Sequence, residues 1–125
     1  MVCDASQLPG TQTVYDRRGK AIDLHPLRTL LVRIETKYHP DQVWLFGSRA
    51  RGEARESSDW DILIVVPDDV EEDELDVVKL WELQRDSGVQ ADVVACHTSE
   101  FVLARHTTNT LAYEAAHAGV RIHER

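Results

Sequence analysis

Two short apolar runs, Val43–Phe46 and Ile62–Val66, enclose a polar stretch of fifteen residues, Gly47–Asp61, which reads GSRARGEARESSDWD. Short apolar runs bounded by turn-forming residues are typical of strands that are buried in a sheet. A glycine closes the first run, and the residues after it favour a short helix over 48–53 that Gly52 ends. The chain is therefore expected to place two buried strands on either side of a short helix and a polar loop.

The rest of the chain alternates helical and strand patterns around these two strands. Leu27, Leu30, Leu31 and Ile34 follow the i, i+3, i+4, i+7 spacing of an amphipathic helix. The expected elements are a helix at 24–38, strands at 43–46 and 60–66 flanking the short helix, a helix at 71–86, a strand at 91–95, helices at 98–105 and 109–118, and a short strand at 120–122. This order predicts the α/β (α+β) class, with a small mixed β-sheet packed by helices. Each tryptophan lies on an apolar element, so Trp44, Trp60 and Trp81 are expected in the core.

A chain of 125 residues is long enough for one compact domain and short for two. We expect that domain over 24–125, preceded by an N-terminal arm over 1–23. Within the arm, 11–15 and 20–22 flank Asp16–Gly19, a segment that could close a small hairpin. Disorder is the competing interpretation, and the pattern does not decide between the two.

The formal net charge of −8 arises mostly from one segment, Asp68–Asp76, which carries seven acids in nine residues. We expect this segment to form a solvated loop and a helix N-terminus, where the helix dipole favours carboxylates. The acidic balance argues against direct nucleic-acid binding, which needs a basic face. No apolar run approaches the length of a membrane span, and the N-terminus lacks the order of a signal peptide, so no membrane association is expected and the cytoplasm is the predicted compartment.

Three aspartates are the candidate catalytic and metal-binding residues. Asp59 and Asp61 are spaced i, i+2 at the start of a strand, so their side chains should share a face. Asp61 also shares that face with Leu63, where an unpaired carboxylate is costly to bury and a bound cation would relieve it. Asp92 opens the next apolar strand and joins the cluster if that strand lies beside the second one. Three carboxylates can hold one or two magnesium ions near a hydroxyl, which suits phosphoryl or nucleotidyl transfer.

The candidate nucleotide-binding residues precede these aspartates. Gly47 lets a phosphate approach the backbone, and Ser48 lies where the N–H groups of the following turn point outward. Arg49 and Arg51 supply cations that could face phosphates. By itself this segment is also compatible with a plain helix cap. The histidines show no ligand spacing in the sequence, and His97 is interpreted as an ordinary loop residue just past the third strand.

The combined pattern resembles a known family. The pattern consists of Gly-Ser, ten residues and an Asp-x-Asp pair between two strands, followed by a lone aspartate that opens a third strand. It resembles the nucleotidyltransferase core of the DNA polymerase β superfamily. The sequences GSRARG at 47–52 and SDWD at 58–61 resemble the minimal nucleotidyltransferase branch, over about residues 24–122. The resemblance implies that Gly47 and Ser48 contact the triphosphate. It likewise implies that Asp59 and Asp61 bind the metal and that Asp92 is a third ligand or the base.

Family members of this size often act as antitoxins beside a HEPN-type ribonuclease toxin, to which they transfer AMP from ATP onto a tyrosine. The resemblance therefore implies Mg²⁺ as cofactor, ATP as substrate and a HEPN-type toxin as partner. Because the chain has no room for an acceptor-binding domain, the acceptor is expected on another chain. Two alternatives stay open. One is a non-catalytic binding module that neutralises its partner by occlusion. The other is a small-molecule nucleotidyltransferase that borrows contacts from a dimer mate, so that homodimers and hetero-oligomers are both compatible with the sequence.

Overall fold

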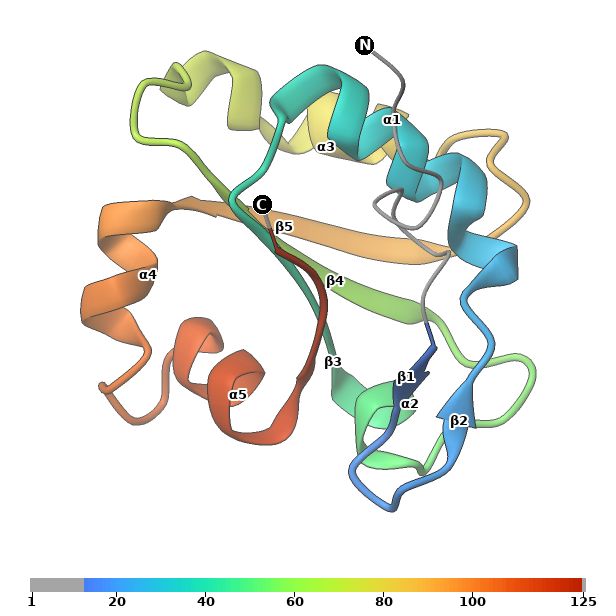
Figure 1. Cartoon of the computed structure of the whole chain (residues 1–125). Helices are drawn as coiled ribbons and strands as arrows, with labels where there is room; N and C mark the ends of the chain where they lie inside the picture. The colour runs from blue at the N-terminus through green and yellow to red at the C-terminus, as the bar shows by residue number, and fades with distance from the viewer. Residues whose placement is uncertain (1–12, 125) are drawn as a thin grey trace, which may run out of the picture.

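A computed structural model describes residues 13–124 (Figure 1). In chain order they form β1 (Val14–Tyr15), β2 (Ala21–Ile22), the 3-10 helix η2 (His25–Leu27), α1 (Arg28–Tyr38), β3 (Gln42–Phe46), α2 (Gly47–Arg51), β4 (Trp60–Val66), the 3-10 helix η3 (Glu72–Leu75), α3 (Val77–Gln84), β5 (Ala91–His97), α4 (Thr98–Ala104), α5 (Leu111–Ala118) and β6 (Val120–Glu124). The expected helices and strands are present, with one exception in the region of 71–86.

The larger sheet has the strand order β5-β4-β3-β6. β3 is antiparallel to both β4 and β6, whereas β4 and β5 are parallel. A parallel pair needs a crossover connection, and α3 lies within it, on the same side of the sheet as α1 (Figure 1). α4 and α5 cover the opposite side. The predicted α/β (α+β) class with a small mixed sheet is therefore confirmed.

Strand β4 is the centre of both hydrophobic clusters. Ile62 and Ile64 pack in the cluster that α1 and α3 cover, which also contains Trp60. Leu63 and Val65 pack on the other side, in the cluster that α4 and α5 cover. Because both faces of the strand are buried, its sequence is a continuous apolar run instead of an alternating one.

The prediction of one helix over 71–86 was wrong. Asp76 has an extended backbone (φ −66°, ψ 152°), and its carboxylate accepts hydrogen bonds from the N–H groups of Val78 and Lys79. This cap starts α3 anew after η3, since an N-cap residue cannot continue a preceding helix. Trp81 is 53% exposed on α3, so its expected core position was wrong as well.

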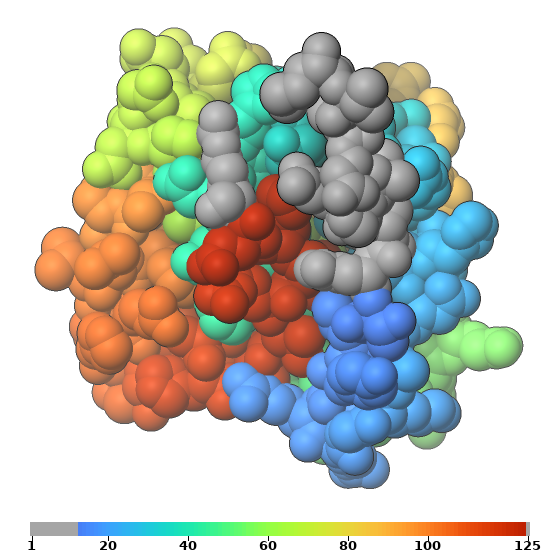
Figure 2. Space-filling view, in the orientation of Figure 1, coloured from blue at the N-terminus to red at the C-terminus, as the bar shows by residue number. Residues whose placement is uncertain are grey.

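The N-terminal hairpin packs against the body of the domain. β1 and β2 are antiparallel, with Val14 opposite Ile22. The Arg17 N–H donates to the carbonyl of Ala50 at 2.8 Å, and the Arg17 Nε donates to the carbonyl of Gly119 at 3.0 Å. Figure 2 shows the hairpin in blue beside the red C-terminal segment.

Residues 1–12 of the expected arm lie outside the described residues. Within 13–124, none of the helices combines the length and apolar character that a bilayer-spanning segment needs.

Candidate functional site

The sheet topology brings the predicted aspartates to one end of the sheet. β4 and β5 pair in parallel with Asp61 opposite Asp92, so these two side chains share a face. Asp59 directly precedes β4. The antiparallel neighbour β3 ends at the same place, since Phe46 pairs with Asp61 and Gly47 follows it. Residues more than forty positions apart in the sequence thus lie together at one end of the sheet.

Gly47 and Asp61 are in close contact. Gly47 has a φ of +73°, a conformation that L side chains rarely adopt, and a Cβ at this position would overlap Oδ2 of Asp61. Glycine is needed here both for its backbone freedom and for the space it leaves. The first residue of α2 therefore contacts one of the candidate metal ligands directly.

The Asp61 carboxylate lies in an unfavourable environment for its charge. Burial raises the pKa of Asp61 above its usual range, and the negative charges of Asp92, Asp59 and Glu114 raise it further. The positive charge of Arg51 acts in the opposite direction and lowers this pKa. One half-buried carboxylate, Asp61, beside the exposed carboxylates of Asp59 and Asp92 forms a set of oxygen ligands suited to a hard cation such as Mg²⁺. The residues present therefore fit the metal that the sequence implies.

Glu114 is a neighbour of the site that the sequence did not indicate. It lies in the first turn of α5, and its Oε1 is 3.5 Å from Nη1 of Arg51. Arg51 also donates from Nε to Oε1 of Glu53 at 2.7 Å. Arg51 thus joins α2 to α5 beside Asp61. Sequence spacing carries no signal for Glu114, because its place depends on how α5 packs against the sheet.

Arg49 holds the loop before Asp59 in place. Its Nη2 donates to the carbonyls of Ser58 at 2.6 Å and Glu56 at 3.0 Å, and its Nε donates to Ser58 at 3.1 Å. The guanidinium lies 4.0 Å from the centroid of the Trp60 ring. These contacts give Arg49 a positioning role in the loop, while its contact with a nucleotide stays a prediction.

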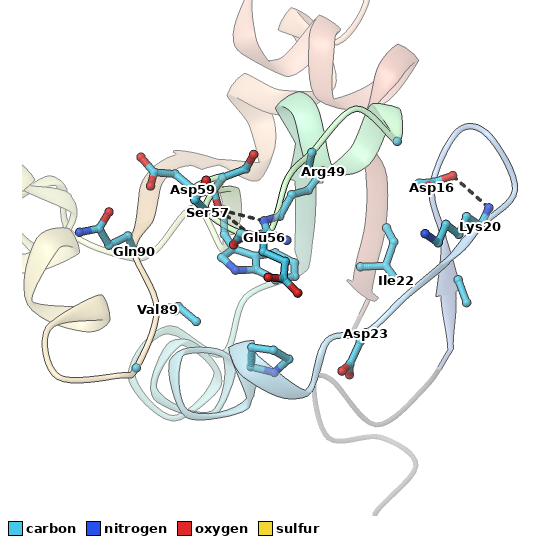
Figure 3. A pocket seen from close by; sticks show the side chains of 17 residues that line it. Asp16, Lys20, Ile22, Asp23, Arg49, Glu56, Ser57, Asp59, Val89 and Gln90 are labelled. Carbon is cyan, nitrogen blue, oxygen red and sulfur yellow. Dashed lines mark hydrogen bonds between the residues drawn. The ribbon is translucent and has the colours of Figure 1, made fainter.

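A cavity of about 670 Å³ opens beside this loop (Figure 3). Arg49, Glu56 and Asp59 lie along its upper part in that view, with the hairpin residues Ile22 and Asp23 on the opposite side. The cavity also reaches the loop that precedes β5. Asp59 is thus shared between the aspartate cluster and the cavity wall.

His97 belongs to a second group of polar residues. It is the last, buried residue of β5, so its interpretation as a loop residue was wrong. Its Nδ1 lies 2.8 Å from Oε1 of Glu100 and 3.7 Å from Oε1 of Glu72, and its Nε2 lies 2.7 Å from the carbonyl of Val70. These hydrogen bonds, first that with Val70 and then that with Glu100, raise the pKa of His97.

The ligand atoms of Glu72, His97 and Glu100 lie within 4.8 Å of one another and could hold a cation. This group was not visible in the sequence, because Glu72 is far from the other two along the chain. It lies where β4 and β5 end, since His97 pairs with Val66, whereas Asp61 and Asp92 lie where the strands begin. The two groups are therefore separate.

A small mixed α/β domain with three carboxylates at one sheet edge, next to a glycine-initiated turn, is an arrangement suited to nucleotidyl transfer. Residues 27–114 match the family model of the nucleotidyltransferase domain. The match spans more than half of the chain, so the protein belongs to the nucleotidyltransferase domain family. The resemblance to a polymerase β-like nucleotidyltransferase is thereby confirmed.

The fold is also similar to a chain from a solved structure described as a crystal structure of a toxin-antitoxin with AMP-PNP. The two chains are 19% identical with a TM-score of 0.51, and the similarity covers 77% of this chain and 72% of the other. At this identity the likeness concerns the fold. No curated protein matches the sequence.

Proposed function

We propose that the protein is a magnesium-dependent adenylyltransferase that transfers AMP from ATP to a tyrosine hydroxyl of a partner protein. The single observation that supports this most is the parallel register that sets Asp61 beside Asp92, with Asp59 next to them and Gly47 in contact with Asp61. Such a group of carboxylates beside a phosphate-accepting turn has the components that the reaction needs.

Asp59, Asp61 and Asp92 would hold the magnesium, whose charge, when bound, offsets the negative charge of the phosphates. The backbone N–H groups that follow Gly47 and Ser48 would contact the triphosphate. In the transfer, the acceptor oxygen forms a bond to the α-phosphorus of ATP while the bond from that phosphorus to the bridging oxygen breaks. Pyrophosphate leaves, and the hydroxyl proton passes to the exposed carboxylate of Asp92 and then to solvent.

For the partner we propose a toxin of the HEPN type, with this chain as its antitoxin, of the minimal nucleotidyltransferase kind. The fold is similar to that of a chain in the solved structure of a toxin-antitoxin with AMP-PNP, and this similarity supports a toxin partner and an adenine nucleotide. The tyrosine acceptor and the HEPN type rest on the motifs at 47–52 and 58–61. A cytoplasmic location and a hetero-oligomer with the toxin follow from the same proposal.

The test is label transfer from α-labelled ATP to the purified partner in the presence of magnesium. Asp59→Asn/Asp61→Asn should lower the transfer rate by at least about a hundredfold, because amides keep the shape but lose the charge that binds the metal. Asp69→Asn/Asp73→Asn, two exposed acids in the acidic segment, is the matched control and should keep full activity. Absence of transfer by the wild type, or equal transfer by the first variant, would sink the enzymatic proposal.

A second candidate function is a binding module that neutralises the partner by occlusion. Its specific support is α3, where Val77 is 82%, Val78 61% and Trp81 53% exposed, since apolar side chains that gather on a surface often mark an interface. Under this alternative, Asp59→Asn/Asp61→Asn still protects cells that produce the toxin. Under the enzymatic proposal it does not. Screening of small hydroxyl compounds as acceptors for the isolated protein separates both from a small-molecule transferase.

A further inference from the structure

We infer that the outer edge of β5, the side away from β4, is the docking site of the acceptor chain. An extended segment of the partner would pair with this edge as an added strand, with the acceptor tyrosine opposite Asp92. The inference rests on the proposed transfer reaction and adds to it the way in which the acceptor is held. β5 is an outer strand of the larger sheet, and Asp92 lies on it with its side chain exposed. A docked segment therefore runs directly beside one of the three aspartates.

The backbone of β5 offers hydrogen-bonding groups along this edge. The Trp60 N–H donates to the carbonyl of Gln90 at 3.0 Å, and this bond fixes which residues of the parallel strand turn their N–H and C=O groups toward β4. Asp92 and every second residue after it face β4, so the residues between them face outward. The outward-facing residues are Ala91, Val93 and Ala95. In the part of the chain from 13 to 124, no strand pairs with this side of β5. Such a row of unpaired groups is a template for an added strand.

The open part of the edge is short and partly apolar. The N–H of His97, the next outward-facing residue, donates to Oε1 of Glu100 at 3.2 Å, so the edge is closed at that end. Val93 and Val94 are only half-buried, whereas the residues opposite them in β4 are buried. An added strand from Ala91 to Ala95 would cover these side chains as well as the backbone groups.

The residue that pairs with Asp92 lies on the correct face of the sheet for transfer. Asp92 and Asp61 point to one face, whereas Trp60 points to the other. In an antiparallel addition, the residue opposite Asp92 forms a non-hydrogen-bonded pair, in which the Cα atoms are about 4.5 Å apart and the side chains share a face. Asp61 lies two strand spacings from the added strand, roughly 10 Å. A tyrosine, whose hydroxyl is at the far end of its ring, can therefore reach across Asp92 toward Asp61.

The residues on either side of the tyrosine would meet α3, which packs over β5 on the other face (Figure 1). Leu83 lines the groove between α3 and α1, whereas Trp81 projects from another side of α3 and is 53% exposed. In the orientation that satisfies its amide, Gln84 donates to the Val89 carbonyl at 3.2 Å and accepts from Trp81 Nε1 at 3.0 Å. Because Val89 comes just before β5, this pair of bonds holds Trp81 near the start of the strand, where Asp92 lies. The segment is therefore expected to have apolar residues directly before and after its tyrosine.

The experiment uses dye-labelled peptides with a central tyrosine between two valines and the full-length protein with magnesium. Fluorescence anisotropy gives the binding affinity, and label transfer from α-labelled ATP gives KM and kcat. N-methylation of either valine blocks an N–H that faces β5, whereas N-methylation of the tyrosine blocks one that faces away. The first change should weaken binding at least about tenfold and the second less than about twofold.

Trp81→Ala tests the contact with α3. It should raise the Kd and the KM for the peptide by about three- to tenfold and leave KM for ATP and kcat unchanged. The matched control is Tyr15→Ala, which removes an aromatic side chain of similar exposure, 58% against 53%, from the hairpin. This control should leave all four values unchanged.

No binding of the unmethylated peptide, equal effects of the two kinds of methylation, or equal effects of the two variants overturns the inference. A dimer of the full-length protein that light scattering detects and that Trp81→Ala converts to a monomer also overturns it, because a second copy would then cover the edge. If these results are accompanied by label transfer to the purified partner, the proposed reaction stands and only the docking mode falls. Methylation-sensitive binding without label transfer to any peptide or to the partner overturns the proposed reaction instead.

Discussion

Position 47 is where the backbone conformation and the candidate chemistry depend on each other. In Gly47→Ala the methyl group must displace the Asp61 carboxylate, and the positive φ costs about 1–2 kcal/mol in addition. We expect label transfer to fall by at least about tenfold, because small displacements of reacting groups have large effects on rate. Initial transfer rates and thermal melting of the same preparation check this.

Gly19→Ala is the control for Gly47→Ala. Gly19 also has a positive φ, +83°, but no atom lies within 4 Å of the position of its missing Cβ. It should show the loss of stability without the loss of transfer. If both variants lose transfer equally, the contact between positions 47 and 61 has no special role.

Much of the aspartate cluster could be predicted at this scale, and the reason is local geometry. Alternation along a strand places Asp59 and Asp61 together, whatever surrounds them. Asp92 could be included only on the condition that its strand lies beside β4, which the topology then satisfied. Glu114 could not be predicted, because helix packing alone decides its distance from Asp61.

At the scale of elements, the start of α3 depends on one carboxylate. Asp76→Ala removes the acceptor for the Val78 and Lys79 N–H groups, which lie 2.7 and 3.1 Å from its Oδ1. The free energy of unfolding should fall by about 1 kcal/mol, the usual effect of losing an N-cap. Urea denaturation measures this value.

Asp73→Ala, in the preceding 3-10 helix, is the control for this loss, and Asp76→Ser should recover most of the stability. If Asp73→Ala lowers the stability as much as Asp76→Ala, the charge of the acidic segment is responsible and not the cap.

Periodicity could not locate this boundary. The apolar residues of 71–86 fit one long amphipathic helix as well as two short pieces, and only the cap at Asp76 distinguishes them. The same ambiguity accounts for Trp81, which the pattern placed inside although α3 buries Leu80 and Leu83 instead. The strands were predicted more accurately. β4 is buried on both faces, and its residues from Ile62 to Val66 are all apolar.

At the scale of the whole molecule, the pairing of His97 and Glu100 should make stability depend on pH. Hydrogen bonding to His97 lowers the pKa of Glu100. The stability contributed by the Glu100 carboxylate is therefore present above about pH 4.3, its unfolded value, and is lost as the pH falls through the folded value. The pKa of His97 is raised, so its contribution is present below about pH 6.5 and is lost as the pH rises through the folded value.

The stability difference between the wild type and His97→Gln should therefore be larger at pH 5.5 than at pH 8.5. Urea midpoints at several pH values give this comparison. Asp69→Asn, next to the same loop but without a contact to His97, should show no such trend. A difference that stays constant over the range would mean that the ring contributes by packing and not by its charge.

The parallel register of β4 and β5 also has a consequence for the order of events during synthesis. Asp61 and Asp92 become neighbours only when the chain has passed through α3 and returned to the sheet, whereas β3 and β4 are joined by a short local connection. A ribosome-bound chain that ends before Ala91 can contain the turn that begins at Gly47 but not all three aspartates of the candidate site. The proposed transfer reaction therefore becomes possible in a nascent chain only after the crossover through α3 has formed.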